Sequence, residues 1–142
     1  MDLLADFLSG DATRIWSASC AVRTLRDSTE LNRLSQHIEQ IKRSTGAVQL
    51  GGALRPNSSH LQFAISKLAF VAKSEDCLCH LYSADDLFDP NREEKEGNVR
   101  ILARALVDNY VDHYTCECGL CGTKYRVEER EYHYTWWSWR KA

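Results

Sequence analysis

The chain has 142 residues, of which 27% are charged, and a formal net charge of −2 at neutral pH. This length suits one domain with its own core, and the small negative charge provides no global basic field for nucleic acid or anionic membrane. No apolar run is long enough to span a bilayer, and the first residues lack the basic and apolar regions of a signal peptide. We therefore expect a cytoplasmic protein, in which cysteine thiols stay reduced.

Apolar residues follow helical spacing through the first half of the chain. The predicted helices cover residues 2–9, 12–26, 28 or 29 to 44, and 59–73. Asp11 is placed to cap the second helix, because its carboxylate can accept the unbonded amide hydrogens of the first turn. Leu31, Leu34, Ile38 and Ile41 form the apolar stripe of the third helix. Residues 1–73 are therefore expected to form a layer of three or four helices.

Strand patterns dominate the second half of the chain. Residues 75–82 alternate and predict a strand, residues 83–98 are acidic and predict a surface loop, and Asp108-Asn109 predicts a turn. Residues 99–107 fit either a helix or a strand, and we expect a strand because the predicted sheet needs neighbours. Further strands are predicted at 110–117, 123–128 and 131–139. The sequence thus predicts a single α+β domain over 1–142, whose helical layer (1–73) packs on an antiparallel β-meander (74–142).

Five of the six cysteines fall in two clusters. The segment Cys118-Gly119-Leu120-Cys121-Gly122 is the C-x-x-C-G turn of a zinc knuckle, in which glycines tolerate the positive φ of a tight turn. In a strand, Cys77 and Cys79 would point to one face. Tetrahedral zinc takes four nitrogen or sulfur ligands, so we expect a structural zinc ion held by Cys77, Cys79, Cys118 and Cys121. Cys116 or His80 is the substitute ligand.

Other interpretations of the cysteines lead to different chemistry. Reduced, buried thiols that act as small hydrophobes are the alternative for the clusters and the expectation for Cys20. A redox C-x-x-C pair would need a helix N-terminus to lower a thiol pKa, and the glycine-flanked hairpin offers none. Four thiolates leave zinc no position for water or substrate, so a catalytic ion is disfavoured. The spacing of His80, His113 and His133 is not specific to an enzyme family, and no catalytic residues are expected.

Acidic and aromatic residues lie on either side of the second cysteine cluster. Strand alternation puts Tyr132, Tyr134 and Trp136 on one face and Trp137 and Trp139 on the other. One set belongs to the core, and the other is either exposed or covered by the rest of the chain. The acidic segment 85–96 suits an electrostatic patch for a basic partner. The predicted partner-binding residues are Asp85, Asp86, Asp89, Glu93, Glu94, Trp136, Trp137 and Trp139.

With the helical half, the Cys77-Leu78-Cys79 segment and the cysteine hairpin ending in Tyr-His-Tyr-Thr-Trp-Trp in view, the chain resembles small bacterial immunity proteins. Those proteins accompany polymorphic or contact-dependent toxins and neutralise them by tight binding, without catalysis. The resemblance implies a cytoplasmic protein-binding inhibitor, either a monomer or a heterodimer with a basic toxin domain. Membrane and nucleic acid are not expected partners in this interpretation.

The alternative function is a zinc-ribbon-like module that binds nucleic acid or acts as an adaptor. Arg126, Arg130, Arg140 and Lys141 would then contact phosphates, while the tyrosines and tryptophans of the last strand stack on bases.

Overall fold

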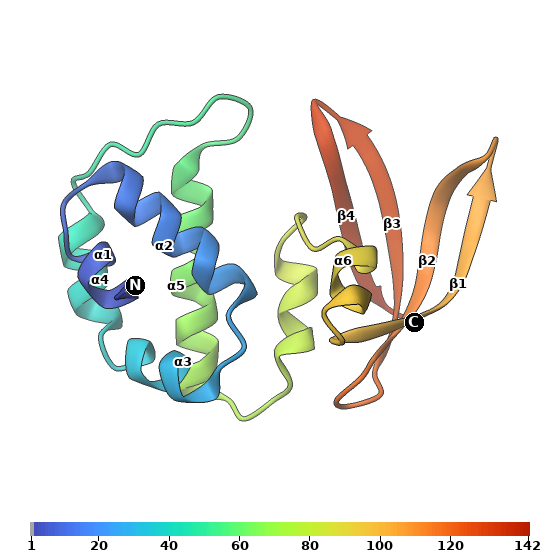
Figure 1. Ribbon diagram of the computed structural model, residues 1–142, viewed down its shortest axis with the longest axis horizontal. Coiled ribbons are helices and arrows are strands. Elements are labelled where there is room, and N and C mark those ends of the chain that lie inside the picture. The colour runs from blue at the N-terminus through green and yellow to red at the C-terminus, as the bar shows by residue number, and fades with distance from the viewer. Residues whose placement is uncertain (1) are drawn as a thin grey trace. The chain divides into compact units, whose positions relative to one another are not determined.

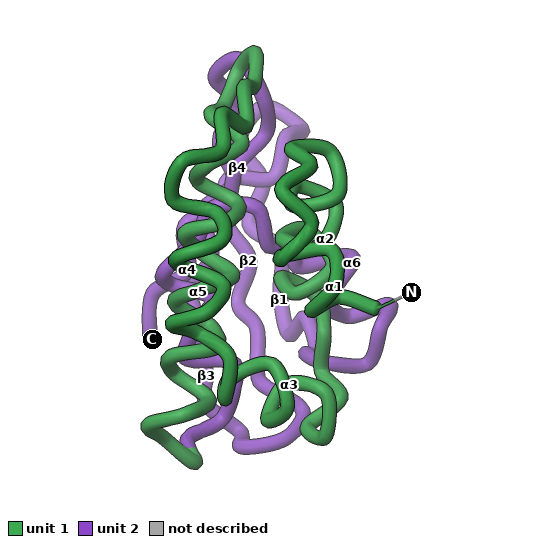
Figure 2. Tube along the Cα trace, turned by 90° about the vertical axis from the view of Figure 1, so that its left-hand side faces the viewer, with its two compact units in different colours: residues 1–75 green, residues 76–142 purple. Residues whose placement is uncertain are grey.

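The computed structural model describes residues 2–142, and the chain divides into two compact units, Met1–Glu75 and Asp76–Ala142 (Figure 2). Helices make up the first unit, and the second contains a four-stranded antiparallel sheet with two short helical segments (Figure 1). The predicted α+β class is therefore confirmed, with N-terminal helices packed together and a C-terminal meander. Within residues 2–142, no helix has the length and apolar character needed to cross a membrane.

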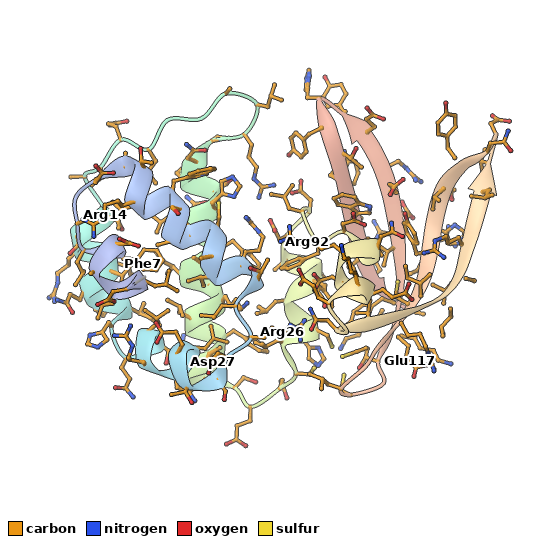
Figure 3. The ribbon with its side chains drawn as sticks, viewed as in Figure 1. Phe7, Arg14, Arg26, Asp27, Arg92 and Glu117 are labelled. Atoms are coloured by element: carbon orange, nitrogen blue, oxygen red, sulfur yellow. The ribbon has the colours of Figure 1, made fainter. Side chains whose placement is uncertain are left out.

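The helices of unit 1 pack around the longest of them. They are α1 Leu3–Phe7, α2 Ala12–Thr24, α3 Ser28–Ser35, α4 Ile38–Thr45 and α5 Asn57–Lys73. Helix α5 contacts α2, α3 and α4, and Phe7 (labelled in Figure 3) and Leu68 are completely buried. The predicted cap is confirmed, because the Asp11 carboxylate accepts a hydrogen bond from Arg14 N at 2.9 Å. Asp2 and Asp27 cap α1 and α3 in the same way.

Helices α1 and α2 each end two residues before their predicted ends, and the third and fourth predicted helices also differ. The helix expected over residues 28–44 is interrupted, since α3 ends at Ser35 and α4 begins at Ile38. At the break, His37 N donates to Leu34 O, a tighter bond than the α-helical one. Of the predicted stripe, Leu31, Leu34 and Ile41 are buried, whereas Ile38, beside the break, is half-buried. Helix α5 begins at Asn57 rather than 59, directly after a proline, which tolerates a helix start because it lacks an amide hydrogen.

The strands of unit 2 follow one another in an antiparallel meander. They are β1 Val99–Val107, β2 Tyr110–Cys118, β3 Lys124–Tyr132 and β4 Tyr134–Lys141, in the order β1-β2-β3-β4. The predictions of a strand at 99–107 and of a turn at Asp108-Asn109 are confirmed; both turn residues have positive φ, as a two-residue hairpin of this type requires. The last hairpin turns at His133, with φ 63°, so β3 runs four residues beyond its predicted end.

The segment before the sheet is helical, which corrects two predictions. Residues 75–82 do not form the predicted strand, and Leu78–Ala84 is instead a 3-10 helix, η1. The predicted loop at 83–98 contains α6, Pro90–Lys95, whose first turn is capped by Asp89. In η1, residues three apart lie above one another, so Cys79 and Tyr82 are both buried. The short apolar pattern suited this period as well as that of a strand.

One face of the sheet, called here the inner face, forms the core of unit 2 with η1 and α6. Its completely or almost completely buried residues are Tyr114, Cys116, Cys118, Tyr125, Val127 and Trp139. The ring of Tyr82 in η1 stacks on Trp139 with centroids 4.2 Å apart and meets Tyr125 edge-on at 6.2 Å. These rings bring η1 against β3 and β4, which places the start of η1 beside the turn between β2 and β3.

Candidate metal centre

Four cysteine sulfurs come together in unit 2. The Sγ atoms of Cys77, Cys79, Cys118 and Cys121 all lie within 4.8 Å of one another. Cys77 Sγ is 3.6 Å from Cys118 Sγ, and Cys79 Sγ is 3.5 Å from Cys121 Sγ. Zinc–sulfur bonds of about 2.3 Å in a tetrahedron put the sulfurs about 3.8 Å apart. The predicted set of four cysteines is therefore brought together at a spacing close to that of tetrahedral zinc.

The first pair is positioned by the start of η1. Cys77 precedes this helix in an extended conformation, and its carbonyl oxygen accepts a hydrogen bond from His80 N at 3.1 Å. Cys79 lies in the first turn, where the Tyr125 hydroxyl donates to its carbonyl oxygen at 3.1 Å and lies 3.0 Å from its sulfur. The two sulfurs thus reach the hairpin from a helical turn, and the strand expected at this position is not needed.

The second pair lies on the turn between β2 and β3. Cys118 N donates to Thr123 O at 2.8 Å, and Gly122 N donates to Cys118 O at 3.0 Å, which closes the turn. Leu120 N donates a hydrogen bond to Cys118 Sγ at 3.4 Å. A donor beside a ligand atom orients that atom and moderates its negative charge. The C-x-x-C-G segment therefore forms the knuckle-like turn that the sequence predicts.

The two glycines of this turn are expected to differ in their tolerance of a side chain. Gly122 has φ +76°, whereas the φ of Gly119 lies outside the left-handed region. We expect Gly122→Ala to lower the free energy of unfolding by about 1 kcal/mol, because a Cβ clashes with the carbonyl in that region. Gly119→Ala is the matched control, since its Cβ would come no closer than 3.4 Å to Asn98 O. Equal losses in urea unfolding would contradict this assignment.

The environment of the sulfurs differs from one side of the group to the other. Burial raises the pKa of the Cys77 and Cys79 thiols above the ordinary value. Hydrogen bonds from Thr123 lower the pKa of the Cys121 thiol to about 6, and Cys121 is exposed. A cation among the sulfurs would favour the thiolate throughout, because a coordinated thiol is deprotonated. The exposed Cys121 is the side from which an ion can enter.

The remaining cysteines and the substitute ligands lie outside the group. Cys116 is completely buried on the inner face opposite Tyr125, and burial raises its pKa to about 12. Cys20 belongs to α2 in unit 1. Within residues 2–142, neither Cys116 nor His80 is part of the four-sulfur group. The preferred ligand set of the sequence is therefore the one that the fold assembles.

Two of the predicted partner-binding residues are buried, and this corrects the prediction for both. The Glu93 side chain is 4% exposed and accepts hydrogen bonds from the Tyr82 hydroxyl at 2.7 Å and Asn98 Nδ2 at 3.2 Å. Trp139 is 2% exposed, and its Nε1 donates to Phe88 O at 2.9 Å. Both side chains hold η1 and α6 against the inner face and are not available to a partner.

The other acidic residues of this set also contact their own unit. Asp89 caps α6, the Glu94 carboxylate accepts from Ile101 N at 2.7 Å, and Asp86 O accepts from Trp137 N at 2.9 Å. Asp85 is half-buried. A role for these residues in partner binding stays a prediction.

The register of β3 and β4 confirms that the tryptophans lie on two faces. Trp139 and Trp137 are opposite Val127 and Glu129 on the inner face, and Trp137 Nε1 donates to the Glu129 carboxylate at 2.9 Å. Trp136 is opposite Arg130 on the other face. Both Trp136 and Trp137 are half-buried.

Comparison of the chain with models of protein families, with curated proteins and with solved structures finds no match.

Proposed function

We propose that this chain is a non-catalytic binding protein whose C-terminal unit is stabilised by one structural zinc ion. The observation that carries the proposal is the close group of four sulfurs. They come from two short pairs separated by about 40 residues, the arrangement typical of structural zinc sites.

The chemistry of the donors supports zinc in a structural role. Four sulfurs in a tetrahedral arrangement favour zinc or iron over the harder cations that oxygen ligands bind. Four protein ligands complete the coordination of zinc, so the ion has no open position at which to activate water or substrate. Donors from Leu120 N and the Tyr125 and Thr123 hydroxyls lie beside the sulfurs, as neighbours of ligating groups commonly do.

The ion would join two parts of unit 2 that are distant in sequence. Cys77 and Cys79 precede and begin η1, while Cys118 and Cys121 border the β2–β3 turn. Closing a chain segment of this length costs conformational entropy, and a metal cross-link offsets that cost. The ion would thereby keep η1 on the inner face, where Tyr82 packs against Trp139.

Metal content of the full-length protein tests the proposal. Elemental analysis is expected to find one zinc per chain in the wild type and in the Cys20→Ala and Cys116→Ala controls. Cys118→Ala is expected to lose it, because only the first two substitutions lie outside the sulfur group. Cobalt(II) in place of zinc should give the visible absorption of a tetrahedral thiolate site. Iron in the site, or a wild type that binds no metal, would contradict the proposal.

The narrower function implied by the resemblance to immunity proteins, inhibition of a basic toxin domain, stays a prediction. Co-purification from the native host tests it directly, with a toxin encoded beside this chain as the expected partner.

A further inference from the structure

The sheet of unit 2 has a second face, called here the outer face, that none of the preceding roles uses. Its side chains are all half-buried or exposed. Strand register places Arg100, Glu117 and Lys124 in one row across β1, β2 and β3. The next row contains Thr115, Arg126 and Arg140. Glu117 is labelled on β2 in Figure 3.

Two arginines are directly opposite each other in the second row. Arg126 and Arg140 are cross-strand partners on strands about 4.8 Å apart, and like charges in such positions destabilise a sheet. Arg126 Nε is 3.8 Å from the Glu128 carboxylate, beyond hydrogen-bond distance. Among residues 2–142, Arg140 makes no ion pair or side-chain hydrogen bond. The two guanidinium groups therefore leave donors available for an anion.

The outer face carries a positive charge, although unit 2 as a whole is acidic. Residues 76–142 contain nine lysines and arginines against 13 aspartates and glutamates. Basic side chains nevertheless exceed acidic ones on the outer face, where the acidic groups are Glu117, Glu128 and the Asp112 carboxylate that lies 3.4 Å from Arg130. The basic residues of this face are Arg100, Lys124, Arg126, Arg130 and Arg140.

Aromatic rings occupy the other end of the same face. Trp136 is opposite Arg130, and Tyr132, which is 73% exposed, is opposite Tyr134. Arg130 Nη1 donates to Asp112 O on β2 at 2.9 Å, and its guanidinium lies 3.4 Å from the carboxylates of Asp112 and Glu128. Nucleobases stack on aromatic rings and on arginine. From the first residue of β3 to the last, the face extends over about 27 Å at about 3.4 Å per residue.

We infer that the outer face binds single-stranded nucleic acid, with phosphates at Arg126 and Arg140 and bases stacked at Trp136 and Tyr132. A single strand presents base faces that a duplex conceals in its own stack, which suits an open sheet with aromatic side chains. The inference rests on the proposed function as a binding protein, and it names the partner class. It does not require the zinc ion to contact the nucleic acid.

Fluorescence anisotropy of labelled oligouridylate and oligothymidylate, each of about 12 nucleotides, tests the inference with the zinc-loaded full-length protein. The logarithm of the association constant is expected to fall linearly with the logarithm of the salt concentration. The double variant Arg126→Gln/Arg140→Gln is expected to bind more weakly and to flatten that slope by about 1.4, because each phosphate contact with a single strand contributes about 0.7. Comparison of the two oligonucleotides shows whether RNA or DNA is preferred.

Two further variants separate local binding from net charge and from folding. Lys42→Gln/Arg43→Gln on α4 removes the same charge from exposed positions in unit 1 and is expected to keep both affinity and slope. Trp136→Leu is expected to weaken binding about tenfold through lost stacking, with no change in slope. The arginine double variant should melt no lower than the wild type, because it removes a repulsive pair.

Several results would overturn the inference. The first is absence of binding to either oligonucleotide at low salt, and the second is an equal loss of affinity in the two double variants. The third is heparin binding as tight as oligonucleotide binding, together with an unchanged affinity of Trp136→Leu for the oligonucleotides. Zinc content is measured on the same samples, so that failure of the zinc proposal can be distinguished from failure of the nucleic-acid proposal. A metal-free protein that still binds through Arg126 and Arg140 would contradict the zinc site alone.

Discussion

Cys118→Ala is expected to melt at a far lower temperature than the wild type, with loss of the strand signal in circular dichroism. Structural zinc contributes on the order of 10–16 kcal/mol in small zinc-binding peptides. The net stability of a domain is only about 5–15 kcal/mol. Loss of one ligand from the four-sulfur group therefore removes a contribution comparable with the whole stability of unit 2.

Cys116→Ala is the matched control for this variant. Cys116 and Cys118 lie two residues apart on β2 and are both buried on the inner face, yet only Cys118 belongs to the sulfur group. A strong chelator should lower the melting temperature of the wild type and of Cys116→Ala but have no further effect on Cys118→Ala. A wild type whose melting does not respond to the chelator would refute the structural ion.

Trp139→Ala is expected to lower the free energy of unfolding by about 3–5 kcal/mol, the usual loss for a large aromatic side chain removed from a core. Trp139 is 2% exposed, stacks on Tyr82 at 4.2 Å and meets Tyr125 edge-on at 5.6 Å. Its indole also donates a hydrogen bond to Phe88 O. The substitution therefore removes contacts to η1, to β3 and to the segment before α6 together.

Trp136→Ala provides the control on the same strand. Trp136 lies on the outer face and is half-buried, so we expect its loss to cost about 1 kcal/mol or less. Urea unfolding of both variants, with zinc content measured in each, separates packing from metal loss. If the two truncations were equally destabilising, the assignment of the inner face as the core would be wrong.

Several of the predicted partner-binding residues are used within unit 2. Glu93 and Trp139 are buried, and Asp89 is used as a helix cap. The outer face, by contrast, exposes the opposed pair Arg126 and Arg140 and has aromatic rings at its other end. The structure therefore favours the outer face over the acidic segment as the first surface to test.

The α+β class and most elements could be predicted because they depend on local signals. Residues 99–107 form a strand as expected, and Asp11 caps α2 through a bond within one helical turn. The failures are at short segments. Residues 75–82 alternate like a strand, yet Leu78–Ala84 is a 3-10 helix whose Tyr82 stacks on Trp139, a contact distant in sequence. The break between α3 and α4 at His37 was likewise not predictable, because no glycine or proline lies there.

By itself, the sequence identified the four cysteines that the fold brings together, since structural zinc sites usually take their four ligands from two short pairs, and such pairs are visible along the chain. Strand alternation also separated Trp136 from Trp139. Only the tertiary structure decided which of the two is buried and that Arg126 is opposite Arg140. The reason is that cross-strand neighbours depend on where the hairpin turns. A shift of the turn away from His133 by one residue would change every pair between β3 and β4.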